Sequence, residues 1–171
     1  MTSWRAVALA TATAWSMGCA GAASITDAEK LERVEEMISE VAERFPDVEH
    51  VTVETVVRLL DKDSVVLVDV REPRERAVSM IAGAIPVEEF ERDPARFADV
   101  AVVAYCTIGH RSSEYARRLA RSGHRVLNLS GSILAWTHAG APLVSNGQPS
   151  LRVHVYGPEW DLAPERFETV R

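Results

Sequence analysis

The stretch Ala101-Val102-Val103-Ala104-Tyr105-Cys106-Thr107-Ile108-Gly109-His110-Arg111-Ser112 joins an apolar run to a polar loop. Its first five residues are uninterrupted and apolar, which is typical of a β-strand covered on both faces. Val65 to Val70 is a second run of this kind, and the pattern from Arg111 to Arg121 predicts a helix. Strands that alternate with helices indicate an α/β fold with a mainly parallel central sheet flanked by helices. Ligands of such sheets bind beyond the carboxyl ends of the strands, where Cys106 lies.

The same alternation extends along most of the chain. Short strands are predicted at His50 to Val53 and at Arg125 to Leu129. Further helices are predicted at Glu54 to Leu60, which a turn at Asp61 to Asp63 follows, and at Gly131 to Ala139. We assign residues 51–144 to this α/β domain.

An amphipathic helix is expected before the domain, within residues 25–50. Thr26-x-x-Glu29 has the form of a capping box. Apolar residues then recur at spacings of three and four, which indicates one buried helical face: Leu31, Val34, Ile38, Val41 and Phe45. The acidic residues between them predict a solvated outer face rather than a metal site.

Residues 145–171 are expected to add a linker and a C-terminal arm. The stretch 145–150 is polar and predicts a linker. Leu151, Val153 and Val155 then alternate with polar or amphipathic residues, which predicts a short strand. This part of the chain would form an added edge strand or a docking arm.

Composition limits the classes of function. The 171 residues are 47% hydrophobic, which suits one domain with extensions. The formal net charge of −6 leaves no cationic excess for holding a phosphate backbone, so we predict no nucleic-acid partner. Two cysteines, Cys19 and Cys106, exclude a multi-disulfide scaffold and a four-cysteine metal site.

Residues 1–24 resemble a secretory or lipoprotein signal segment. One positive charge precedes an Ala-rich uncharged run and a stretch of small residues. Ala20-Gly21-Ala22 is similar to a cleavage site, whereas Gly18-Cys19 is similar to a lipoprotein site at which Cys19 is lipidated. We therefore expect an exported protein, periplasmic or anchored to the membrane through a lipid on Cys19. The alternatives are an Ala-rich tail or a true start at Met17, and either would leave the protein in the cytoplasm.

The Cys106 loop, residues 106–112, lies between the strand and the helix N-terminus. Unpaired amides at a helix N-terminus and the nearby Arg111 are expected to lower the pKa of the Cys106 thiol. Gly109 permits the turn that lets several amides converge. The alternative is a small apolar cysteine that closes a strand. The complete loop favours a reactive thiol.

Three separated motifs resemble those of the rhodanese-like sulfurtransferases. They span residues 51–144 in the order that the family shows. They are Leu67 to Pro73 followed by Ile81 to Pro86, then Cys106-x-x-Gly109-x-Arg111-Ser112, and then Gly131 to Trp136 followed by Gly140-Ala141-Pro142. Met80, Ala82 and Ser132 depart from the family pattern, which concerns substrate or partner contacts more than the fold.

The resemblance implies a sulfurtransferase. Cys106 would attack the outer sulfur of a donor such as thiosulfate, become a persulfide and pass the sulfur to a thiophile such as cyanide, a thiol or a protein acceptor. The amides from Thr107 to Arg111 would hold the persulfide, the side chains of Thr107 and Ile108 would shape access, and no metal or organic cofactor is implied.

The remaining residues near the loop are interpreted one by one. Arg111 either binds the anionic end of the donor or forms a structural pair. His110 lines the mouth of the site or is merely exposed, with general-base catalysis a further hypothesis. Asp69 and Arg71 are predicted to form a polar pair that supports the loop. The other histidines lack ligand-like spacing, and we predict that they are surface or packing residues: His50, His124, His138 and His154.

Two alternative functions remain open. Many rhodanese-like domains are non-catalytic, so the chain could act as a binding module or sulfur carrier that docks through its acidic helix and its C-terminal arm. Related cysteine phosphatases and arsenate reductases have five residues between Cys and Arg, whereas four separate Cys106 from Arg111 here. By resemblance, the shorter loop favours a single sulfur over a phosphoryl group.

Overall fold

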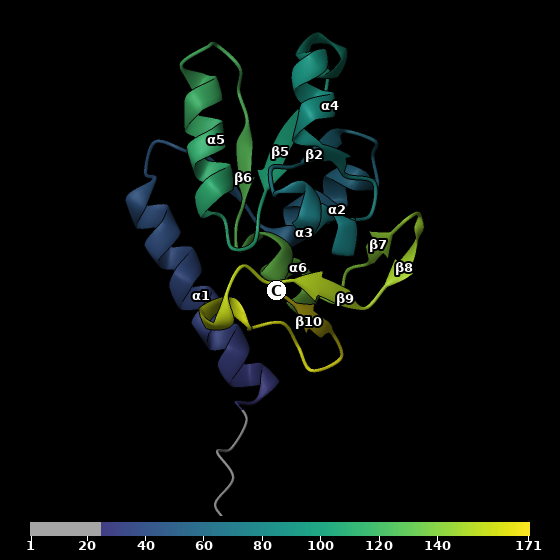
Figure 1. Ribbon diagram of the computed structural model, residues 1–171. Coiled ribbons are helices and arrows are strands. Elements are labelled where there is room, and N and C mark those ends of the chain that lie inside the picture. The colour runs from purple at the N-terminus through teal and green to yellow at the C-terminus, as the bar shows by residue number, and fades with distance from the viewer. Residues whose placement is uncertain (1–24) are drawn as a thin grey trace, which may run out of the picture.

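The central sheet of the computed structural model has five parallel strands (Figure 1). The structure describes residues 25–171, so the predicted signal segment and Cys19 lie outside the described residues. The strands, in spatial order, are β1 (His50–Val51), β6 (Leu127–Leu129), β5 (Ala101–Tyr105), β2 (Val65–Asp69) and β4 (Ile85–Pro86). The predicted α/β fold with a mainly parallel sheet is therefore confirmed.

Alternate residues of β2 and β5 enter two separate apolar cores. Leu67 belongs to one core, while Val66 and Val68 belong to the other. The Leu67 core includes residues of α2 (Val53–Leu60) and α6 (Ser132–His138), and the Val66 core includes residues of α4 (Val87–Arg92) and α5 (His110–Ala120). Successive residues of a strand point to opposite faces of the sheet, and both faces of these strands are covered by an apolar core. This arrangement explains why both strands are continuous runs of apolar residues.

The register of the central strands places polar residues at the start of the Cys106 loop. Val65 pairs with Ala101 at one end of the β2–β5 ladder, and Asp69 pairs with Tyr105 at the other. Both strands therefore end at the same level. Asp69 lies beside Tyr105, the residue that precedes Cys106, at the carboxyl edge of the sheet. The loops that lead from the strands to the helices begin at this edge.

The predicted N-terminal helix is present as α1 (Asp27–Arg44) and begins with the predicted capping box. The backbone amide of Thr26 donates to Glu29 Oε2 at 2.7 Å, and that of Glu29 donates to Thr26 Oγ1 at 3.3 Å. The helix packs against α6 beside Gly131, which has φ of +67°; a Cβ there would lie 2.6 Å from Ala135 Cβ and 2.7 Å from Ile38 Cδ1, so a side chain at this position would be strained. Among residues 25–171, no helix combines the length and the apolar character needed to span a membrane.

The remaining elements surround the sheet. They are α3 (Pro73–Val78), the 3₁₀ helices η1 (Pro94–Phe97) and η2 (Pro158–Trp160), and three strands that form an antiparallel sheet in the order β3 (Met80–Ile81), β7 (Leu143–Ser145) and β8 (Gln148–Ser150).

The prediction of a polar linker over residues 145–150 is wrong. Strands β7 and β8 form a hairpin through Asn146 and Gly147, which have φ of +50° and +75°. Positive φ at both central residues is the geometry of the tight hairpin turn that Asn-Gly favours. The second strand, Gln148–Ser150, is short and polar, so the sequence there has the composition of a loop.

The C-terminal segment, residues 151–171, is part of the core rather than an arm or an added edge strand of the central sheet. Strand β9 (Arg152–His154) pairs in parallel with β10 (Glu168–Val170). The apolar residues of this segment that join the main core are Val153, Val155, Leu162, Ala163 and Phe167. The predicted alternation fails at two positions, because Leu151 is 62% exposed and His154 is buried.

Candidate active site

Gly109 shapes the turn between β5 and α5. Its φ of +118° lies in the region that favours glycine, and it occupies the N-cap position of α5. Its backbone amide donates to Cys106 Sγ at 3.2 Å. A Cβ at this position would approach Asn128 Nδ2 to 3.2 Å. The turn therefore directs a backbone donor at the sulfur and leaves no free space for a side chain.

The Cys106 thiol lies in an electrostatic environment that favours the thiolate. Cys106 is 1% exposed, and burial alone would raise the pKa of its thiol. The Ser112 hydroxyl at 3.5 Å, the positive charge of Arg111 and the amide of Gly109 act in the opposite direction and hold that pKa below its ordinary value. A lowered thiol pKa increases the fraction of the nucleophilic thiolate at neutral pH.

A chain of hydrogen bonds connects the thiol to Phe45, the C-cap residue of α1. Ser112 Oγ donates to Asn128 Oδ1 at 2.6 Å, and Asn128 Nδ2 donates to His50 Nδ1 at 3.0 Å. His50 Nε2 donates to the carbonyl of Phe45 at 3.2 Å. Since a carbonyl only accepts, His50 carries its proton on Nε2 and accepts on Nδ1, which fixes the orientation of the Asn128 amide. The single proton of Ser112 is therefore shared between Asn128 and the Cys106 sulfur.

Arg111 forms a structural pair with the buried Glu75 of α3. Its Nη1 and Nη2 atoms donate to the two Glu75 carboxylate oxygens, each at 2.7 Å, and Nη2 also donates to Thr107 Oγ1 at 3.1 Å. Burial would raise the pKa of Glu75, but the hydrogen bonds from Arg111 and from the Glu72 backbone, together with the charges of Arg111 and Arg71, hold that pKa below its ordinary value. Both groups are therefore charged at neutral pH, and the pair has no net charge.

Asp69 and Arg71 form a fully buried pair beneath the loop. Arg71 Nε and Nη2 donate to the two Asp69 carboxylate oxygens at 2.9 Å and 2.7 Å. Tyr105 donates its hydroxyl to Asp69 Oδ2 at 2.6 Å, and Arg71 Nη2 also donates to the Ser79 carbonyl at 2.7 Å. These contacts hold the end of β2, the end of β5 and the start of the Cys106 loop together.

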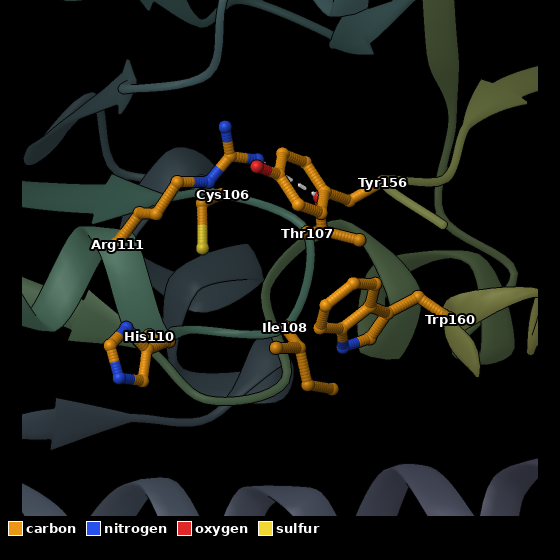
Figure 2. A pocket seen from close by; sticks show the side chains of 7 residues that line it. All are labelled: Cys106, Thr107, Ile108, His110, Arg111, Tyr156 and Trp160. Atoms are coloured by element: carbon orange, nitrogen blue, oxygen red, sulfur yellow. Dashed lines mark hydrogen bonds between the residues drawn. The ribbon is translucent and has the colours of Figure 1, made fainter. Parts of the chain in front are cut away.

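A pocket of about 190 Å³ opens over the thiol (Figure 2). In this view, the rings of Tyr156 and Trp160 lie on the right of the pocket, and Arg111 and His110 lie on the left. The lining residues are Cys106, Thr107, Ile108, His110, Arg111, Tyr156 and Trp160. A bound molecule would therefore meet the reactive sulfur at one end and aromatic surface along one wall.

The structure brings five of the predicted site residues into one pocket and places three beside or below it. Gly109 supports the sulfur from the loop backbone, and Asp69 and Arg71 lie under the loop outside the lining. The His110 side chain is 37% exposed, packs edge-on against Phe45 and has Nδ1 3.9 Å from Glu114.

Sequence reasoning missed several residues that shape the site. They are Glu75, Ser112, Asn128, Tyr156 and Trp160. The sequence carried only weak signals for them. Ser112 follows directly after Arg111, and Tyr156 and Trp160 are large aromatic residues in the C-terminal segment. In the part of the chain that the structure describes, no group of three or more His, Cys, Asp or Glu residues could hold a metal ion.

The Rhodanese-like domain family matches residues 52–139, half of the chain. The chain belongs to this family. A sulfurtransferase of Allochromatium vinosum is 40% identical over 93 residues, which cover 52% of this chain and 86% of that protein. An uncharacterised protein of Synechocystis is 33% identical over 94 residues, and this chain spans about half of its length.

Two solved structures are similar to this chain. Thiosulfate sulfurtransferase from Pseudomonas aeruginosa is 25% identical with a TM-score of 0.53, and the similar region covers 72% of this chain and 24% of that one. A Rhodopseudomonas palustris protein of unknown function, described as a possible tyrosine phosphatase, is 28% identical with a TM-score of 0.50 and covers 65% of this chain and 93% of its own. Tyr156 and Trp160 lie outside the residues that match the family.

Proposed function

We propose that the protein is a sulfurtransferase that transfers a sulfane sulfur through a persulfide on Cys106. The Cys106 thiolate attacks the outer sulfur of a donor such as thiosulfate, so that a new S–S bond forms and sulfite leaves with the electron pair of the old one. A thiophile such as cyanide or a thiol, including a thiol on a protein acceptor, then takes the terminal sulfur and regenerates the thiolate. With cyanide the product is thiocyanate.

The observation that carries the proposal is the position of the Cys106 sulfur. It lies at the floor of an open pocket, it accepts a hydrogen bond from the Gly109 amide, and its pKa lies below the ordinary value. The Gly109 amide and the unpaired amides in the first turn of α5 supply donors for a bound persulfide anion. Arg111 acts through its charge and its pair with Glu75 to hold the loop in place.

Intact-mass measurement of the full chain after incubation with thiosulfate tests the proposal. We expect the mass of one added sulfur atom, which cyanide then removes. Cys106→Ser should abolish the gain, whereas the matched control Cys19→Ser should leave it unchanged. Absence of any gain in the folded, reduced protein, with thiosulfate or with other sulfane-sulfur donors, would contradict the proposal and leave the binding-module alternative.

The same sample distinguishes the phosphatase alternative. Four residues separate Cys106 from Arg111, and Arg111 donates to Glu75 with both of its terminal nitrogens. The Arg111 side chain therefore has little free donor capacity for a tetrahedral phosphate. We expect no hydrolysis of phenyl phosphate under conditions in which thiosulfate loads Cys106.

A further inference from the structure

We propose that Tyr156 and Trp160 form a subsite for the organic group of the sulfur donor, so that the protein prefers a singly charged organic sulfane-sulfur compound with an apolar substituent to inorganic thiosulfate. This inference rests on the proposed sulfur transfer at Cys106. In this proposal the C-terminal segment binds the organic group of the donor, and this segment lies outside the residues that match the family.

The first argument is the shape of the pocket wall. Tyr156 and Trp160 line the same cavity of about 190 Å³ as Cys106 and Ile108 (Figure 2). A persulfide needs only one sulfur atom of space at the floor of this cavity. The remaining volume lies against two aromatic rings and an aliphatic side chain, and such surfaces favour apolar or aromatic groups.

The second argument is charge. Thiosulfate is a dianion, and its sulfonate end would lie away from the sulfur, toward the mouth of the pocket. The Arg111 guanidinium in the lining already donates two hydrogen bonds to the Glu75 carboxylate, so this ion pair has no net charge to offer a dianion, and the Tyr156 ring covers the guanidinium with a distance of 5.1 Å to the ring centroid. A donor with one negative charge close to its sulfur can be held by the loop amides alone.

The third argument is that the subsite is built before a donor binds. Tyr156 follows the fully buried Val155, and Leu162 is buried two residues after Trp160. The two rings pack edge to face with centroids 5.3 Å apart, and the Trp160 amide donates to the Gly157 carbonyl at 3.0 Å. A wall that is already ordered costs little conformational entropy when a ligand binds.

A matched pair of donors tests the subsite. Benzenethiosulfonate and methanethiosulfonate carry the same charge and the same reacting group, and each would transfer its outer sulfur to the Cys106 thiolate and leave as a sulfinate. We expect kcat/KM for the benzene compound to exceed that for the methane compound by about tenfold, the size of effect expected from one aromatic contact. Thiosulfate, measured in parallel with the full chain, should have the lowest kcat/KM.

Variants of the C-terminal segment locate the effect. Trp160→Ala and Tyr156→Ala should bring the ratio between the two thiosulfonates close to one. Leu151→Ala removes an exposed apolar side chain of the same segment that does not line the pocket, so it should leave the ratio unchanged. Thermal unfolding of each variant checks that it remains folded.

Three results would overturn the inference. A ratio near one in the unmodified protein would exclude the subsite while leaving sulfur transfer intact. A large ratio that persists in both folded aromatic variants would place the selectivity elsewhere. Failure of every donor to load Cys106 would refute the proposed function, and the subsite would fall with it.

Discussion

The Cys106 loop and the C-terminal segment form two sides of one pocket but are built in different ways. Side chains from α3, α5, β6 and α6 hold the loop through buried or partly buried hydrogen bonds and an ion pair. The C-terminal segment is held by apolar burial, and its two pocket residues are partly or largely exposed. The reactivity of Cys106 therefore depends on the loop side, where several hydrogen bonds fix the positions of the groups around the sulfur. The side that contacts the rest of a donor can vary without disturbing the thiol.

The largest expected effect comes from breaking the buried support of the loop. Arg71→Leu leaves the Asp69 carboxylate buried without its cation, so we expect the free energy of unfolding to fall by about 3–5 kcal/mol. Chemical denaturation measures this change. As a control, Arg74→Leu removes the exposed pair with Glu72 on the same stretch of chain and should cost less than about 1 kcal/mol. Equal losses in both variants would show that the loop is not held more tightly than the surface.

Gly109→Ala should produce the next largest effect. An alanine there adopts an unfavourable φ and meets Asn128, so we expect the free energy of unfolding to fall by about 1–3 kcal/mol and the rate of sulfur loading to fall with it. Gly123→Ala is the matched control, because Gly123 also has positive φ but has open space around its Cβ position. Full loading by Gly109→Ala would contradict the assigned role of this turn.

The hydrogen-bond chain behind the thiol predicts opposite shifts for two neighbouring residues. Ser112→Ala removes a donor to the thiolate, so the pKa of Cys106 should rise by about one unit. Asn128→Ala releases the Ser112 hydroxyl to the sulfur, so the pKa should fall. Since only the thiolate reacts, the rate of iodoacetamide alkylation should begin to rise at a higher pH in the first variant and at a lower pH in the second. Shifts in the same direction would refute this arrangement.

The smallest effect is expected on the C-terminal side. Tyr156→Leu removes the aromatic face from Arg111, and the interaction of a partly exposed cation with a ring contributes about 0.5–1 kcal/mol. Tyr156→Phe keeps the ring and should leave the free energy of unfolding unchanged. A loss in Tyr156→Leu as large as that in Arg71→Leu would mean that the two sides of the pocket are not built differently.

Local patterns predicted the elements whose causes are local. The capping box at Thr26 and Glu29, the apolar runs of β2 and β5, and the loop from Cys106 to Ser112 depend on residues close together in sequence. The hairpin of β7 and β8 was missed although its Asn146-Gly147 turn was visible, because its flanking strands are too short to show a clear period.

The partners of Arg111 could not be derived in the same way. Glu75 lies 36 residues away in the sequence and meets Arg111 only because α3 and α5 both begin at the carboxyl edge of the sheet. The same holds for Asn128, which reaches Ser112 from β6. Such pairs depend on strand order and register, which the residues themselves do not encode at short range.

Local sequence patterns place a cysteine after a buried strand and before a helix N-terminus, because strand periodicity, glycine conformation and helix capping act over a few residues. The sequence also carries the family motifs that predict the α/β fold. Three features follow instead from contacts in the folded chain: Glu75 pairs with Arg111, Asn128 shares the proton of Ser112, and Tyr156 and Trp160 form a wall of the pocket. These contacts join residues distant in sequence, and they form only when burial of the apolar cores brings the strand ends and the C-terminal segment together.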